Sequence, residues 1–249
     1  MKRVKLVVAY DGTNYCGWQV QKNGETIESV LNRAIGELTG EEIHVMGSSR
    51  TDAGVHACGN VAVFDTEARM AADKFSYALN QRLPEDIRIQ DSCEVPADFH
   101  PRFQKTVKTY EYRILNREFP LPAYRFNSHF TYRKLDVERM KQAAAYLIGE
   151  HDFQSFCAAG AQVKTTVRTI YALDVEKQGD LIIIRITGNG FLYNMVRIIA
   201  GTLMKIGQGD WEPEYIPEIL EGCDRQLAGP TAPARGLTLM EIHFKGEKG

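Results

Sequence analysis

The sequence has few cysteines and no long apolar run. Its five cysteines are widely spaced, and none belongs to a Cys-x-x-Cys pair. This spacing argues against a zinc site and against the disulfide framework of a secreted protein, and it fits reduced cytosolic thiols. The apolar run after Arg3 stops at Asp11, which is too short for a signal peptide, and no stretch approaches the ~20 apolar residues of a membrane span. We therefore expect a cytoplasmic protein without a membrane segment.

Cofactor motifs are also absent from the sequence. The glycines that follow the first apolar run lack the GxGxxG spacing of a phosphate-binding loop. His56, His100 and His151 lack the spacing of a metal-ligand set, so we interpret them as structural residues or as contacts to a ligand of another kind. We expect neither a metal nor an organic cofactor.

The formal net charge is only −2, but the charges are unevenly distributed. Eight Lys/Arg and two acidic residues lie between Arg102 and Lys134, whereas the segment 207–224 has six acidic residues and no Lys/Arg. This basic segment carries several aromatic residues, among them Phe103, Tyr110, Tyr112, Tyr124, Phe126 and Tyr132. Cations neutralise phosphates and rings stack on bases, so the pattern fits a polyanionic, base-bearing ligand. On charge alone, a solvated strand face with a half-buried aromatic side fits equally well.

Apolar periodicity predicts a mixture of strands and helices. In the first half, the predicted elements are strand 4–10, a helix capped by Thr26, strands 43–46 and 61–64, a helix after Asp73, and strand 87–95. In the second half, they are strands 105–115 and 126–132, a helix from Asp136 to Gly149, strands 166–176 and 181–187, a helix over 191–206, a short acidic helix after Pro213, and strand 237–244.

The first half therefore has the order βαββαβ, and the second half repeats this order with insertions. The order is typical of α+β folds of the ferredoxin-like (RRM-like) kind. We expect two similar halves, residues 1–100 and 101–249, with mainly antiparallel sheets that flank a central cleft. The repeat is one of element order, because no convincing residue-level repeat is visible.

The segment 47–59 is the least like regular structure. It places Arg50, Asp52, Gly54 and short polar residues between two apolar strands, so it is predicted to be a loop held by a sheet. Gly54 permits a tight turn beside Asp52. An isolated loop of this kind is more often an Asx-turn, in which Asp52 accepts backbone N–H groups and Arg50 is solvated. Other polar segments of the chain decide between these interpretations.

Seven segments have the order and spacing of one known family. They are Tyr10–Gln19, Gly47–His56, Asp98–Phe103, Lys108–Arg113, His151–Phe156, Phe191–Arg197 and Thr231–Leu237. Together they closely resemble the tRNA pseudouridine synthase A family, from the first strand to about Phe244. The Arg-Thr-Asp-Ala-Gly-Val-His run is the most specific of them.

The resemblance implies an isomerase that converts uridine to pseudouridine in the anticodon arm of tRNA, around positions 38 to 40, without a cofactor. It gives Asp52 the role of the catalytic nucleophile. Tyr110 matches the tyrosine that packs on the target base, and Arg197 matches the arginine that pairs with the aspartate. Arg50 matches an arginine that helps to extrude the base. The resemblance also implies a homodimer and a cleft that binds RNA.

Two positions depart from the family pattern. Ser49 stands where the family commonly has glycine, and Thr238 stands where an aromatic residue often follows Gly-Leu. Neither is the nucleophile, so both bear on substrate fit more than on activity.

Several alternatives stay open at this point. Asp52 could attack the sugar, attack the base or remove a ribose proton. Without the resemblance, Arg197 would be interpreted as a helix arginine stretched over the surface, and Tyr110 as one cross-strand aromatic residue among several. A non-catalytic RNA-binding module and an N-glycosidase that releases uracil are the competing functions. A purely structural role fits the loop least well.

Overall fold

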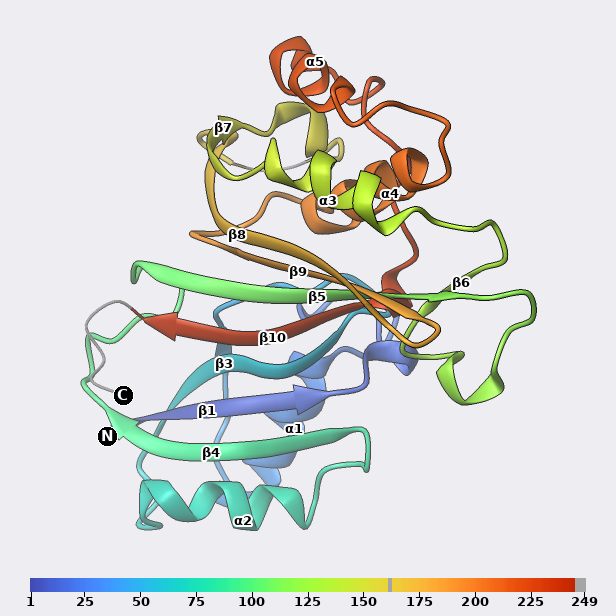
Figure 1. Cartoon of the computed structure of the whole chain (residues 1–249). Coiled ribbons are helices and arrows are strands. Elements are labelled where there is room, and N and C mark those ends of the chain that lie inside the picture. Colours follow the sequence, from blue (N-terminus) through green and yellow to red (C-terminus); the bar gives the residue numbers. More distant parts are fainter. Residues whose placement is uncertain (161–162, 245–249) are drawn as a thin grey trace. The chain divides into compact units, whose positions relative to one another are not determined.

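The computed structural model of the chain describes residues 1–160 and 163–244 (Figure 1). It divides into two compact units. The first unit comprises Met1–Lys105 and the chain from Leu239 onward, and the second comprises Thr106–Thr238. The boundary therefore falls after Lys105, and most of the last strand groups with the N-terminal residues, whereas the sequence division assigned all of 101–249 to one half.

The first unit is a sheet with two main helices. Its elements are β1 (Lys2–Tyr10), α1 (Ile27–Thr39), β2 (Met46–Gly47), β3 (His56–Thr66), α2 (Phe75–Asn80), β4 (Ile87–Val95) and β10 (Leu237–Phe244). The strand order is β4-β1-β3-β10, with β2 paired to β3. The pairs that β1 makes with β3 and β4 are both antiparallel. Figure 1 shows α1 behind these strands.

Side-chain alternation along β1 builds the core of this unit. The buried residues of the strand are Val4, Leu6, Val8 and Tyr10. They follow the period of two that places one face of a strand on a core. The helix α1 begins after Thr26, as predicted, because the Thr26 side chain accepts a hydrogen bond from the Ser29 N–H in a capping box. The helix then ends at Gly40, whose φ of 74° stops further helical turns.

The second unit is a sheet covered on one side by helices. Its elements are β5 (Thr106–Asn116), β6 (His129–Thr131), α3 (Val137–Ala145), β7 (Gly149–Asp152), β8 (Val167–Gln178), β9 (Leu181–Gly188), α4 (Met195–Gly207) and α5 (Tyr215–Gly222). The order β5-β9-β8-β7 is antiparallel throughout, and β6 adds to β5 in parallel. Figure 1 shows α3, α4 and α5 on the same side of β8 and β9. The predicted mixture of helices and mainly antiparallel strands is confirmed.

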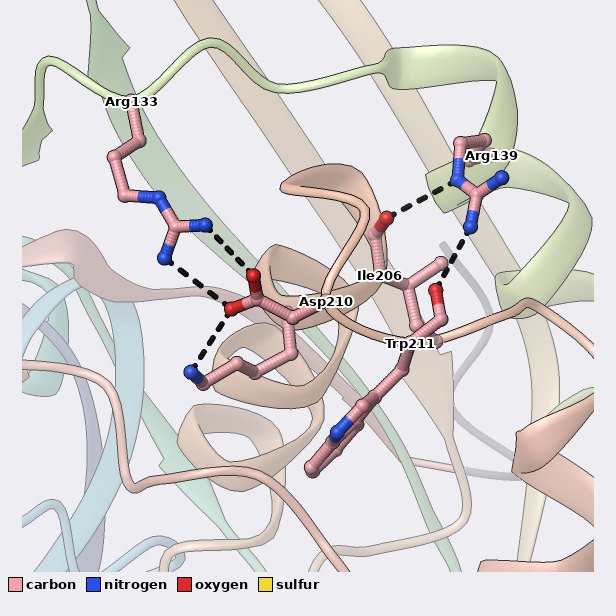
Figure 2. Close-up of polar contacts among 6 residues, drawn as sticks. Arg133, Arg139, Ile206, Asp210 and Trp211 are labelled. Carbon is pink, nitrogen blue, oxygen red and sulfur yellow. Dashed lines mark hydrogen bonds and ion pairs between the residues drawn. The ribbon is translucent and has the colours of Figure 1, made fainter.

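An arginine of α3 caps the C-terminal end of α4 (Figure 2). Arg139 donates from Nε to the carbonyl oxygen of Ile206 at 3.3 Å and from Nη2 to that of Trp211 at 2.9 Å. The last carbonyl groups of a helix have no partner within the helix, so a cation placed there stabilises its end.

None of the helices in the described ranges is long and apolar enough to cross a membrane.

A carboxylate just beyond the C-terminal end of α4 forms ion pairs with two cations. Asp210 accepts from Arg133 at 2.7 Å (Figure 2). It also pairs with Lys205 at 3.0 Å. The hydrogen bond from Arg133, and then that from Lys205, lower the pKa of Asp210 to about 2. These contacts hold the end of the helix that carries Arg197 in its first turn.

The predicted strand 43–46 is wrong. Only β2 pairs with β3 in this region. The backbone N–H of Val45 is instead donated to the side-chain oxygen of Asn32 in α1, at 2.8 Å. β3 in turn begins at His56 and not at Val61, so the loop that carries Asp52 is confined to residues 48–55.

Three predictions in the second unit also need correction. The strand expected at 126–132 shrinks to β6, because the N–H of Asn127 turns back to the carbonyl oxygen of Tyr124 at 3.3 Å. The helix expected from about 191 starts at Met195, since Asn194 has a left-handed φ of 60°. The helix from Asp136 ends at Ala145, and strand β7, which the sequence did not predict, follows it.

Candidate active site

Asp52 lies in a tight turn between β2 and β3. The N–H of Val55 donates to the carbonyl oxygen of Asp52 at 3.1 Å and closes the turn. Gly54 has a φ of 76°, a left-handed conformation that favours glycine. The residues just before Asp52 are mostly buried, whereas Asp52 itself is half-buried. The carboxylate is therefore carried by a loop whose backbone is fixed against the sheet.

A buried amide of β3 holds the start of this loop. Asn60 is 0% exposed; its Oδ1 accepts from the N–H of Ser49 at 3.3 Å, and its Nδ2 donates to the Ser49 carbonyl oxygen at 3.0 Å. The same Nδ2 donates to the hydroxyl of Tyr10 at 3.2 Å, and this hydroxyl lies 2.7 Å from Oγ1 of Thr51. One side chain thus satisfies both backbone groups of Ser49, and the network fixes the residues that lead to Asp52.

The segment that follows β1 supports the loop from another side. The N–H of Trp18 donates to the carbonyl oxygen of Thr51 at 3.0 Å, and the N–H of Gly54 donates to that of Tyr15 at 3.4 Å. Gly17 has a φ of 88°, and a Cβ at this position would lie 2.7 Å from the Thr51 carbonyl oxygen. A side chain at Gly17 would therefore displace the loop. These contacts explain why the Tyr10–Gln19 motif accompanies the Asp52 motif.

His56 has a structural contact at the end of the loop. Its Nδ1 accepts from the N–H of Gly12 at 3.1 Å and lies 3.1 Å from Oδ1 of Asp11. Burial alone would raise the pKa of Asp11, but hydrogen bonds from Thr13, with a smaller contribution from His56, lower it overall. In the part of the chain that the structure describes, no three His, Cys, Asp or Glu side chains gather in a way that could hold a metal ion.

Two arginines place positive charge beside the loop. Arg50 is exposed, and its Nη1 donates to Oε1 of Gln19 at 3.4 Å. Arg102 donates from Nε to the carbonyl oxygen of Gly47 at 2.9 Å. Desolvation lowers the pKa of Arg102, and the positive charge of Arg50 lowers it further. Glu28 offsets part of this repulsion. A pair of neighbouring cations is suited to an anionic ligand.

Tyr110 lies on β5 of the second unit, opposite Ile186 of β9. Its half-buried ring meets the ring of Phe191 edge-on, with centroids 5.3 Å apart and an interplanar angle of 86°. Its registered neighbour across the strands is thus aliphatic, and its aromatic partner comes from the segment before α4. The ring is held in one orientation while part of it stays accessible.

Arg197 is fixed by acceptors at the start of α4. Its Nε donates to the carbonyl oxygen of Ala232 at 2.8 Å, and its Nη1 donates to Oδ1 of Asn194 at 2.8 Å. The N–H of Ala232 returns a hydrogen bond to the carbonyl oxygen of Arg197 at 3.1 Å. Arg197 is half-buried and held by these acceptors, so it is not the arginine stretched over the surface that the sequence without the family resemblance would suggest.

The four predicted site residues fall into two pairs. Arg50 and Asp52 belong to the loop of the first unit, and Tyr110 and Arg197 belong to the second unit. Sequence reasoning missed Asn60. The one signal for it is a polar residue that immediately precedes the apolar run 61–64.

The family model described as tRNA pseudouridine synthase matches residues 6–104 and 143–245. The chain belongs to the tRNA pseudouridine synthase family. Among curated relatives of this family, the tRNA pseudouridine synthase A of Acetivibrio thermocellus is 49% identical over 244 residues, which are 98% of this chain and 100% of the relative. The enzyme of the same name from Brevibacillus brevis is 50% identical over 245 residues, with the same coverage.

Solved structures give a much weaker likeness. An H/ACA RNP bound to a substrate RNA containing 2′-deoxyuridine aligns with 12% identity and a TM-score of 0.34. The alignment covers 95% of this chain and 45% of that chain. A TM-score this low bears neither on the fold nor on the function.

Proposed function

We propose that this chain isomerises uridine to pseudouridine in the anticodon arm of tRNA, around positions 38 to 40, with Asp52 as the nucleophile. Full-length similarity to relatives named tRNA pseudouridine synthase A supports both the reaction and the substrate. The observation that carries the proposal is the half-buried Asp52 on a tightly held loop, within the family's most specific motif. In the same proposal, Tyr110 stacks on the target base, Arg197 pairs with Asp52, and Arg50 helps to extrude the base.

Pseudouridine formation exchanges one bond to uracil for another. The N1–C1′ bond breaks, the uracil turns, and a C5–C1′ bond forms. The hydrogen on C5 leaves as a proton and N1 gains a proton, so the step balances without an oxidant or a transferred group. Attack on the sugar, attack on the base and removal of a ribose proton all require Asp52 to be ionised. A guanidinium next to a carboxylate favours the ionised form, and this is the effect proposed for Arg197.

The target uridine has to leave its stack before the reaction. Extrusion of a base costs a few kcal/mol, and a ring stacked on the extruded base recovers about 1–3 kcal/mol. The half-buried ring of Tyr110, held edge-on by Phe191, suits this role.

Three further features belong to the same proposal. The order of the predicted elements supports two ferredoxin-like halves that flank an RNA-binding cleft, the spacing of the cysteines supports a cytoplasmic location, and the family resemblance supports a homodimer. Light scattering on the purified chain tests the dimer directly, with a monomeric mass as the contradicting result.

Tritium release from tRNA labelled at uridine C5 tests the reaction. The proposal predicts release by the wild-type chain with no free uracil in solution. Free uracil would instead identify the N-glycosidase, which breaks the N1–C1′ bond and adds water. Binding of tRNA with neither product would identify the non-catalytic RNA-binding module.

A further inference from the structure

A stacked aromatic pair with one exposed ring lies beside the Asp52 loop in the first unit. The rings of His100 and Phe103 are stacked, with centroids 4.1 Å apart and an interplanar angle of 25°. Phe103 is 84% exposed, which leaves its outer face open to solvent. Exposure of an apolar phenylalanine ring to water is not favourable. An exposed ring that is held by stacking on one face is therefore suited to bind a planar ligand on the other.

The backbone around this pair is bonded to the loop itself. The hydroxyl of Ser48 donates to the carbonyl oxygen of Pro101 at 2.9 Å, and Arg102 donates to the carbonyl oxygen of Gly47 at 2.9 Å. The N–H of Phe103 closes a turn onto the carbonyl oxygen of His100 at 3.2 Å. The exposed ring therefore belongs to a segment that is hydrogen-bonded to the start of the Asp52 loop.

The ligand of this ring is expected to be anionic. Arg102 lies next to Phe103 in the chain and donates to the carbonyl oxygen of Gly47, three residues before Arg50. The positive charge of Arg50 lowers the pKa of Arg102 by more than the negative charge of Glu28 raises it. A phosphate near the two guanidinium groups would relieve this repulsion. A ligand that combines a flat ring with a phosphate is a nucleotide.

We propose that Phe103, backed by His100, is a stacking platform for a base of the substrate RNA other than the target uridine, with Arg102 and Arg50 facing its phosphate. The inference rests on the proposed function for the identity of the RNA, and it adds a binding residue to that function. Stacking of one base is worth about 5- to 150-fold in affinity, so this is the expected loss when the ring is removed.

Binding of unmodified tRNA tests the platform without depending on turnover. We expect Phe103→Ala to weaken binding by about 5- to 150-fold. Phe103→Trp should bind as the wild type does, because indole also stacks on bases. Tyr77→Ala is the matched control: Tyr77 is 70% exposed in the same unit and has Lys74 5.6 Å from its ring, but it lies on α2. The control is expected to bind as the wild type does.

The tryptophan variant supplies a second readout. Stacking on a base should quench the added fluorescence of Phe103→Trp when tRNA is titrated, whereas Tyr77→Trp should show no change. Three results would each overturn the platform. They are an unchanged tRNA affinity of Phe103→Ala, no quenching of Phe103→Trp by tRNA, and a Phe103→Ala variant that changes its oligomeric state but not its tRNA affinity. If the wild type releases tritium in any of these cases, the proposed function survives while the platform fails. Absence of tritium release from the wild type contradicts the proposed function, and the binding data still decide the platform.

Discussion

Replacement of Asn60 by leucine should separate the support of the active-site loop from general stability. Leucine has the same branched shape but offers no hydrogen bond, so both hydrogen bonds between the Asn60 side chain and the Ser49 backbone are lost. A hydrogen bond of this kind contributes about 0.5–1.5 kcal/mol, so the loss of the two predicts a fall of about 1–3 kcal/mol in the free energy of unfolding. The Tyr10 hydroxyl keeps its contact with Thr51, which limits the damage.

The loop carrying Asp52 should also shift, and activity should fall with it. A displacement of reacting groups by about 1 Å costs on the order of 100-fold in rate. We expect Asn60→Leu to lower kcat by about 10- to 100-fold, with little change in RNA affinity. If Asn60→Leu does not fold, Tyr10→Phe removes the hydroxyl between Asn60 and Thr51 and should lower kcat less strongly.

Asn80→Leu is the matched control for this prediction. Asn80 of α2 clasps Ile89 of β4 in the same way: its Nδ2 donates to the Ile89 carbonyl oxygen and its Oδ1 accepts from the Ile89 N–H, both at 2.8 Å. This variant should lose stability, measured by urea unfolding, but keep the wild-type kcat. Equal falls in kcat for the Asn60 and Asn80 variants, measured where both are folded, would refute the positioning role of Asn60.

Three further predictions follow from the structure. The pKa of Asp210 lies at about 2, below its ordinary value of 3.8, so the stability that this carboxylate provides is present above 3.8 and is lost as the pH falls through about 2. The difference in unfolding free energy between wild type and Asp210→Asn should therefore be constant at neutral pH and shrink in that window; a difference that persists in acid would be the contrary result. Gly17→Ala forces a side chain into a left-handed position against the Thr51 carbonyl and should cost about 1–3 kcal/mol, measured by urea unfolding; unchanged stability would show that the loop yields easily. Tyr110→Phe keeps the ring and should keep both RNA affinity and turnover, whereas lost turnover with intact binding would assign chemistry to the hydroxyl.

The sequence predicted a helix or strand well where neighbouring residues in the chain determine its faces and its ends. The alternation along β1 and the caps at Thr26 and Asp136 are visible in the sequence and are present in the structure. The strand expected at 43–46 failed because Asn32, on a preceding helix, takes the backbone N–H of Val45. Such a competition between a side chain and a strand partner appears only when the elements are packed.

The candidate site shows the same division. The Asp52 loop was predicted as a loop because polar residues and glycine interrupt two apolar runs, and the family motif gave Asp52 its role. The hydrogen bonds that hold the loop could not be predicted, because Asn60 bonds to Ser49 and Tyr10, which lie in other parts of the sequence. Likewise, no periodicity in the chain indicated that Arg197 would be fixed by Ala232.

Substitution of the proposed nucleophile tests the account most directly. Asp52→Asn preserves the size of the side chain but removes the ionisable carboxylate, and Asp91→Asn makes the same change at an exposed position of β4. In the assay of tritium release from C5-labelled tRNA, we predict that Asp52→Asn releases none while it binds tRNA as the wild type does, and that Asp91→Asn is fully active. Tritium release by Asp52→Asn at a rate near that of Asp91→Asn would contradict the assignment of Asp52 as the nucleophile.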